Sequence, residues 1–175
     1  MFELNFLEKT ALDIQLKYFK RTPEQTGTIF YALELAGETG EFLNLIKKYI
    51  RTEITEKKFN LLPKIFEELA DMSISVIMLK LSLSRKFSRF QVQNKQNYNK
   101  IEDLHKIFGA LCLQAANWYT LSLESVLNSQ NFEEPYYEFI ENLNIVSKFF
   151  DFELSEAVLS KLNEITIKVL RGDYD

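Results

Sequence analysis

Apolar residues recur at helical spacing along most of the 175-residue chain, and no segment keeps the alternation of a β-strand. The low content of turn-forming residues, five Gly and three Pro, agrees with long helices. We therefore predict an all-α helical bundle forming one domain over residues 1–175. About six helices are expected, at residues 3–20, 28–50, 61–84, 101–129, 135–150 and 154–171, with polar connections at 51–60 and 84–100. The longer connection separates a first half, 1–84, from a second half, 101–175.

The segment 61–84 is apolar around almost its whole circumference, a pattern typical of a buried helix. One narrow polar stripe interrupts it and includes Glu68 and Asp71. The segment 28–50 contains a second pair of acids, Glu38 and Glu41. Residues three apart lie about 60° from each other around a helix, so each pair shares one face. Two acidic pairs on two neighbouring buried helices predict a four-carboxylate cation site.

The chemistry of such a site follows from its oxygen ligands. Carboxylates are rarely buried unless they are paired or bound to a metal. Mg²⁺ prefers oxygen ligands and often binds through a few carboxylates together with substrate phosphates. The four acids therefore favour phosphoryl chemistry on a polyphosphate, with one metal site per chain because no second intact set of acids occurs. Gly37 and Gly40, which each cost a helix roughly 1 kcal/mol, indicate either close helix packing or room for a ligand.

The segments LAGETGE (35–41), IKK (46–48) and ELAD (68–71) resemble the signature of the MazG-like nucleoside triphosphate pyrophosphohydrolases. That signature is Glu-Glu-x-x-Glu followed by Glu-x-x-Asp, and here Gly37 replaces the leading acid. The resemblance covers residues 28–83 well. It implies the all-α NTP pyrophosphohydrolase bundle and hydrolysis of a (deoxy)nucleoside triphosphate to the monophosphate and pyrophosphate. It also implies Mg²⁺ as cofactor, with Mn²⁺ able to substitute, and a homodimer or larger homo-oligomer.

By this resemblance Glu38, Glu41, Glu68 and Asp71 would be the catalytic and metal-binding residues. Which carboxylate orients the attacking water stays open. The segment 161–164 is loosely similar to a tail segment of the family. The candidate phosphate contacts, each also readable as an ordinary helix-surface residue, are Lys48, Lys161, Asn163 and Arg171. Four aromatic residues could stack on a base, although aromatic residues at helical spacing more often belong to the core: Phe30, Tyr31, Trp118 and Tyr119.

A weak internal similarity relates the two halves of the chain. Residues 30–35 can be laid over 108–113, and residues 66–71 over 139–144. In these registers the four acids fall opposite Ala116, Tyr119, Glu141 and Asn144. The similarity predicts a duplicated helix pair whose second copy has lost its acidic site, with chance likeness of amphipathic helices as the alternative. A duplicated second half could take the place of a neighbouring subunit.

Charge and composition restrict the remaining function classes. The net charge of −4 gives no basic face for nucleic acid and disfavours anionic membranes. A single cysteine, Cys112, allows no internal disulfide, and no apolar run is long enough for a membrane span, so a cytoplasmic location is expected. A di-iron bundle would need two Glu-x-x-His elements, but Glu102 and His105 supply only one. The stronger alternative is a catalytically inactive helical interaction or regulatory protein on the same scaffold.

Overall fold

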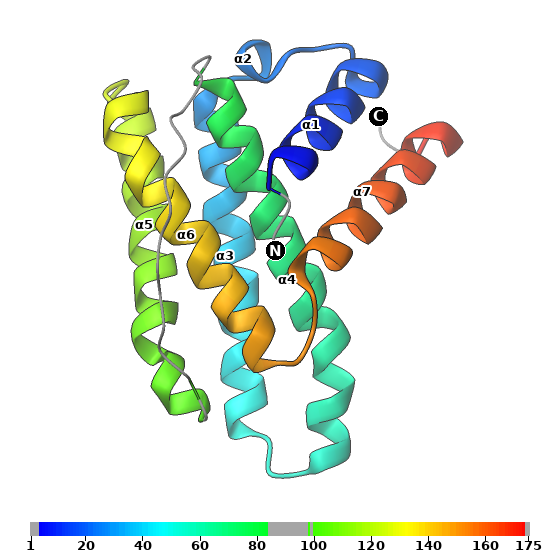
Figure 1. Cartoon of the computed structure of the whole chain (residues 1–175), viewed down its shortest axis with the longest axis vertical. Helices are drawn as coiled ribbons and strands as arrows, with labels where there is room; N and C mark the ends of the chain where they lie inside the picture. Colours follow the sequence, from blue (N-terminus) through cyan, green and yellow to red (C-terminus); the bar gives the residue numbers. More distant parts are fainter. Residues whose placement is uncertain (1–3, 84–97, 99, 174–175) are drawn as a thin grey trace.

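The computed structural model describes residues 4–83, 98 and 100–173. Within these residues all regular structure is helical, which confirms the all-α prediction (Figure 1). The α-helices are α1 (Leu4–Ile14), α2 (Pro23–Thr26), α3 (Thr28–Arg51), α4 (Thr55–Ser82), α5 (His105–Leu123), α6 (Ser129–Phe149) and α7 (Leu154–Arg171). A π-helical turn (Gln15–Phe19) follows α1, and a 3₁₀ turn (Ile101–Leu104) precedes α5.

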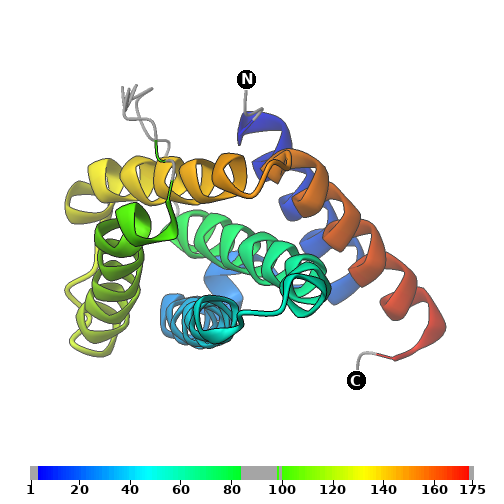
Figure 2. The same cartoon turned by 90° about the horizontal axis from the view of Figure 1, so that it is seen from below.

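Helix α4 is the centre of the arrangement. It runs antiparallel to α3 after a short connection, and Figure 2 shows it between α3, α6 and α7. Helix α1 packs on α4 and α7, and α5 packs on α3 and α6. The nearly continuous apolar surface of α4 requires this, because each face must be covered by a neighbour.

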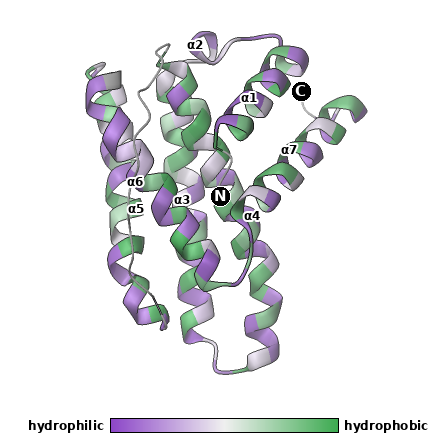
Figure 3. Cartoon of the chain, in the orientation of Figure 1, coloured by the Kyte–Doolittle hydropathy of each residue, from purple (hydrophilic) through white to green (hydrophobic). Residues whose placement is uncertain are grey.

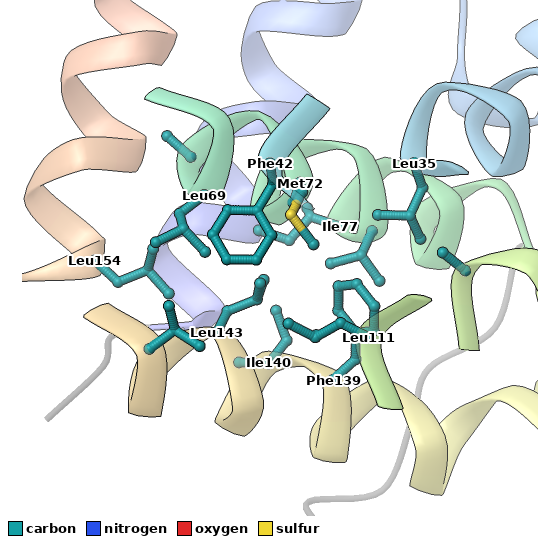
Figure 4. Close-up of a cluster of buried hydrophobic side chains, with 14 of the residues drawn as sticks. Leu35, Phe42, Leu69, Met72, Ile77, Leu111, Phe139, Ile140, Leu143 and Leu154 are labelled. Carbon is teal, nitrogen blue, oxygen red and sulfur yellow. The ribbon is translucent and has the colours of Figure 1, made fainter. Parts of the chain in front are cut away.

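One hydrophobic core connects the helices. Figure 4 shows Phe42 of α3, Met72 of α4, Leu111 of α5, Leu143 of α6 and Leu154 of α7 pointing toward one another. All five are almost completely buried. Hydrophobic and polar positions alternate around the helices in Figure 3, so the amphipathic pattern of the sequence is used directly in packing.

The connection between α3 and α4 is shorter than predicted. The sequence suggested a polar connection over 51–60, but only residues 52–54 separate the two helices. Residues 55–60, polar or charged except for Phe59, form the mostly exposed first turns of α4, and Glu and Lys are good helix formers. Pro63 lies inside this helix, where its missing N–H removes one backbone hydrogen bond near the exposed start.

The helix predicted at 101–129 is shorter in the structure, where α5 covers His105–Leu123. The next helix, α6, begins at Ser129, earlier than predicted. Helix α5 ends at Leu123, and Asn128 caps α6 by accepting hydrogen bonds from the backbone N–H groups of Gln130 and Asn131. Pro135, expected at the helix start, therefore lies inside α6. The capping side chain defines the start because it satisfies backbone donors that a proline cannot.

Other predicted boundaries are confirmed. Helix α7 has the predicted bounds, and Gly172 ends it with φ of +78°, a conformation that suits glycine. The chain also leaves helical geometry before Pro23, as expected for a residue preceding proline. The predicted connection 84–100 lies outside the described residues except for Tyr98 and Lys100.

The arrangement of the helices is compatible with the predicted duplication. The overlaid segments belong to α3 and α4 in the first half and to α5 and α6 in the second. Each pair forms a helical hairpin with a short connection (Figure 1). Common ancestry of the two hairpins stays a prediction, because hairpins of amphipathic helices also arise independently.

A buried polar contact ties α1 to the bundle. The Glu8 carboxylate on α1 accepts hydrogen bonds from Lys80 Nζ on α4 at 2.6 Å and from the Tyr136 hydroxyl on α6 at 2.7 Å. The Lys80 and Glu8 side chains are only 10% and 13% exposed. Burial and the nearby Glu8 charge raise the pKa of Tyr136, so this hydroxyl stays protonated and donates. Three helices are thus joined at one carboxylate.

We expect Glu8→Ala to lower the free energy of unfolding by about 2–3 kcal/mol, because Lys80 and Tyr136 lose a shared, largely buried acceptor. The matched control is Asp13→Ala, which removes an exposed carboxylate from the same helix and should change stability by less than about 0.5 kcal/mol. Urea unfolding measures both. Equal stabilities of the two variants would contradict the role of Glu8.

Candidate metal centre

The four predicted acids lie on the facing sides of α3 and α4. Glu41 precedes the end of α3 by about 15 Å, and Glu68 follows the start of α4 by about 20 Å. Since the two helices are antiparallel and joined by a short connection, these positions fall at similar heights. Burial of Phe42 from α3 beside Leu69 and Met72 from α4 favours this register (Figure 4).

Three of the four acids converge. Glu38, Glu41 and Glu68 each offer a carboxylate oxygen, and these oxygens lie within 4.8 Å of one another. Two oxygen ligands on opposite sides of a Mg²⁺ ion lie about 4.2 Å apart, so the spacing is close to what such an ion spans. No Lys, Arg or His of the described residues forms an ion pair with these three carboxylates. Within the described part of the chain, the negative charge of the cluster therefore has no ion-paired cation.

Burial and the negative charge of the cluster raise the pKa values of Glu38 and Glu68. Burial raises the pKa of Glu38 to about 7, and the charges of Asp71, Glu68 and Glu41 add to the effect. The interaction between Glu38 and Glu68 adds to the rise in the pKa of Glu38 and opposes the rise in the pKa of Glu68. Burial and the charge of Glu41 still leave the pKa of Glu68 above its ordinary value. The three carboxylates are held where they favour a bound cation or proton.

Asp71 has a different partner. Its Oδ2 atom lies 2.8 Å from Lys161 Nζ on α7, and the same Nζ lies 2.8 Å from Glu67 Oε1. Burial raises the pKa of Asp71, and the hydrogen bond and charge of Lys161 oppose this rise. Burial would lower the pKa of Lys161, but its bonds to Asp71 and Glu67 raise it overall. Lys161 thus stays charged and connects α7 to the acidic site.

Two further acids surround the site and were missed in the sequence. Glu34 lies one turn before Glu38 on α3, and burial and the charge of Asp71 raise its pKa. Glu67 binds Lys161 from α4. The signal for Glu34 was present, because residues 34, 38 and 41 share one helical face. The role of Glu67 depends on the position of α7, which local spacing does not indicate.

Of the four predicted phosphate contacts, the structure brings only Lys161 to the carboxylates. Lys48 is exposed near the end of α3, about 10 Å along the helix from Glu41. Asn163 is exposed on α7, and Arg171 is exposed at its last residue, about 15 Å beyond Lys161. None of these three forms a described contact with the acids.

The aromatic candidates divide into buried and exposed residues. Trp118 is fully buried between α5 and α6, with ring centroids 4.6 Å from Phe132 and 5.3 Å from Phe139. Tyr31 is also buried. These two belong to the core, as the alternative interpretation stated. Phe30 is 48% exposed and Tyr119 partly exposed, so only these remain open to a base.

Gly37 and Gly40 do not mark close helix packing. A Cβ atom built on either glycine would have no neighbouring atom within 4 Å beyond its own helix, and both residues are exposed. The tight-contact interpretation is therefore wrong. Open space lies beside α3 at these two positions, next to the helix face that carries Glu38 and Glu41.

Comparison with known proteins adds no identification. Searches of protein families, of curated proteins and of solved structures find no match to this chain. The MazG-like resemblance stays a prediction based on the two motifs. Among the described residues, no helix is both long and apolar enough to cross a membrane.

We expect metal-free stability to fall as pH rises from about 5 to about 7.5. The folded protein binds the Glu38 proton with a pKa of about 7, whereas the ordinary value is 4.5, so deprotonation between these values favours unfolding. The raised pKa values of Glu34, Glu68 and Asp71 act in the same direction. Thermal unfolding in a chelator measures this slope.

Glu38→Gln should make that pH profile flatter, because the amide resembles the protonated acid. The control, Glu138→Gln on the exposed face of α6, should keep the wild-type slope. A wild-type Tm that stays constant or rises across this window would contradict the raised pKa of Glu38.

We also expect Gly37→Ala to raise the free energy of unfolding by about 0.5–1 kcal/mol, since alanine favours the helix and its Cβ meets no atom. Gly27→Ala is the contrasting variant. Gly27 has φ of +100°, so a side chain there should lower stability by about 1 kcal/mol. Chemical denaturation compares them, and a loss of stability in Gly37→Ala would show that this space is occupied.

Proposed function

We propose that the protein is a Mg²⁺-dependent nucleoside triphosphate pyrophosphohydrolase that releases a (deoxy)nucleoside monophosphate and pyrophosphate. The observation that carries the proposal is the convergence of Glu38, Glu41 and Glu68 in a cluster that forms no ion pair with any cation of the described residues. Asp71 on the same polar stripe of α4 completes the two motifs that resemble the MazG-like signature. Assembly as a homodimer or larger homo-oligomer and a cytoplasmic location belong to the same proposal.

The donor set fits a hard divalent cation. Glu38, Glu41 and Glu68 would hold Mg²⁺, with Mn²⁺ as a substitute, and Asp71 could join them. When bound, the cation would neutralise the phosphates and lower the pKa of a coordinated water. These carboxylates also repel an unaccompanied triphosphate, so the nucleotide must enter with its cations. That requirement makes the site selective for metal-bound polyphosphates.

The reaction adds one water molecule to the nucleotide. The oxygen of water attacks the α-phosphorus, the bond from this phosphorus to the α–β bridging oxygen breaks, and pyrophosphate leaves with that oxygen. A carboxylate not fully engaged as a ligand can accept the proton of the water. Lys161, the one candidate phosphate contact beside the acids, could bind the charge of the triphosphate.

The second candidate function is a catalytically inactive helical interaction or regulatory protein. The contact of Lys161 with Asp71 and Glu67 favours it, because this lysine neutralises part of the acidic site without any metal. The cluster of Glu38, Glu41 and Glu68, which has no ion-paired cation among the described residues, speaks against it. A scaffold gains nothing from like charges held within 4.8 Å.

The decisive experiment incubates the protein with each ribo- and deoxyribonucleoside triphosphate and Mg²⁺ and measures pyrophosphate. We expect release from at least one nucleotide, abolished by a chelator. Glu41→Gln and Asp71→Asn should each lower kcat by about 100-fold or more, because each removes a charge from the proposed metal site. Glu138→Gln, remote on α6, should keep full activity.

Stability measurements keep this result interpretable. Metal-free Glu41→Gln should be as stable as the wild type or more stable, because repulsion within the cluster decreases. Lost activity would then reflect chemistry and not unfolding. Turnover of no nucleotide by the wild type, or full activity in both variants, would reject the enzyme and leave the scaffold.

A further inference from the structure

Lys161 links helix α7 to the candidate metal site on α4. Its side chain is 14% exposed, and it reaches from α7 to two acids of α4 at 2.8 Å each. Asp71 is one of the four predicted ligands, whereas Glu67 is outside the motif and 50% exposed. The lysine therefore has one partner within the metal site and one partner beside it.

Asp71 lies near the three glutamates, and its charge acts on Glu38, but its own ion-pair partner is Lys161. Glu38, Glu41 and Glu68 form a three-membered group, and Asp71 is outside the group although it lies one turn from Glu68 on α4. Its Oδ2 atom is bound to Lys161 Nζ. A lysine ammonium and a divalent cation compete for the same carboxylate oxygen, since each supplies the positive charge that a partly buried carboxylate needs.

We propose that Lys161 is a displaceable internal counter-charge, which holds Asp71 outside the three-glutamate cluster until a divalent cation takes its place. Glu67 makes the displacement easy, because Lys161 can keep this second ion pair when it releases Asp71. Binding of the cation is then coupled to the contact between α7 and α4. The inference rests on the proposed function only in that the cluster binds a divalent cation.

The experiment measures metal binding directly, without nucleotide. Free Mn²⁺ is counted by electron paramagnetic resonance as it is titrated into the full-length wild type, Lys161→Met and Lys168→Met. Loss of the competing charge should tighten Mn²⁺ binding by Lys161→Met about three- to tenfold. Lys168 lies on the same helix and pairs with Glu164 in place of the motif acids, so Lys168→Met removes an equal charge and should bind nearly as the wild type does.

A double-mutant cycle tests whether Lys161 affects Mn²⁺ binding through Asp71 or only by changing the electrostatic potential at the site. The gain from Lys161→Met should disappear in an Asp71→Asn background, because no carboxylate remains there for the lysine to withhold. Without metal, Lys161→Met should have a lower Tm than the wild type, and saturating Mn²⁺ should raise its Tm more. If circular dichroism shows that Lys161→Met does not fold, Lys161→Gln replaces it with the same expectations.

Each result has a defined meaning. Unchanged or weaker Mn²⁺ binding by Lys161→Met, an equal gain in Lys168→Met, or a gain that persists with Asp71→Asn would overturn the counter-charge role and leave the pyrophosphohydrolase proposal intact. No Mn²⁺ binding by any variant would overturn both. The predicted Mn²⁺ binding pattern without hydrolysis of any nucleotide would support the counter-charge and reject the enzyme alone.

Discussion

The packing of α3 against α4 is the constraint on which the rest of the structure depends. Phe42 of α3 lies beside Leu69 and Met72 of α4 in the fully buried core, and burial of these side chains favours one register of the two antiparallel helices. The register brings acids together that would separate in an unconstrained chain, because like charges repel. Hydrophobic burial thus holds these carboxylates in an electrostatically unfavourable state, which is the basis for the cation site that we propose.

Much of this could be predicted from local sequence. The helical class follows from the periodicity, and three-residue spacing places Glu38 with Glu41, and Glu68 with Asp71, on a shared helix face. The end of α7 was also readable, because Gly172 signals it locally. These features share one property: each depends on residues within two turns of helix.

The predictions that failed depended on competing local signals or on distant contacts. The charged first turns of α4 resemble a loop, and Pro135 resembles a helix start until the Asn128 cap is weighed against it. The contact of Lys161 with Asp71 joins residues ninety positions apart. Residue spacing within one helix does not indicate how α7 packs on α4. The same reason explains why the Glu8 contact was not foreseen.

Two polar networks on α4 provide an internal comparison. Lys80 and Glu68 point about 120° apart around the helix axis. At Lys80 the buried ammonium is ion-paired with Glu8, and the Tyr136 hydroxyl donates a hydrogen bond to the same carboxylate. At Glu68 three carboxylates converge, and no cation of the described residues is ion-paired with them. Within the described part of the chain, the same helix thus carries one carboxylate with an ion-paired lysine and one group of carboxylates without an ion-paired cation. Like charges held close together by core packing cost stability, and a cation bound there would offset that cost, which is the physical argument behind the proposed metal site.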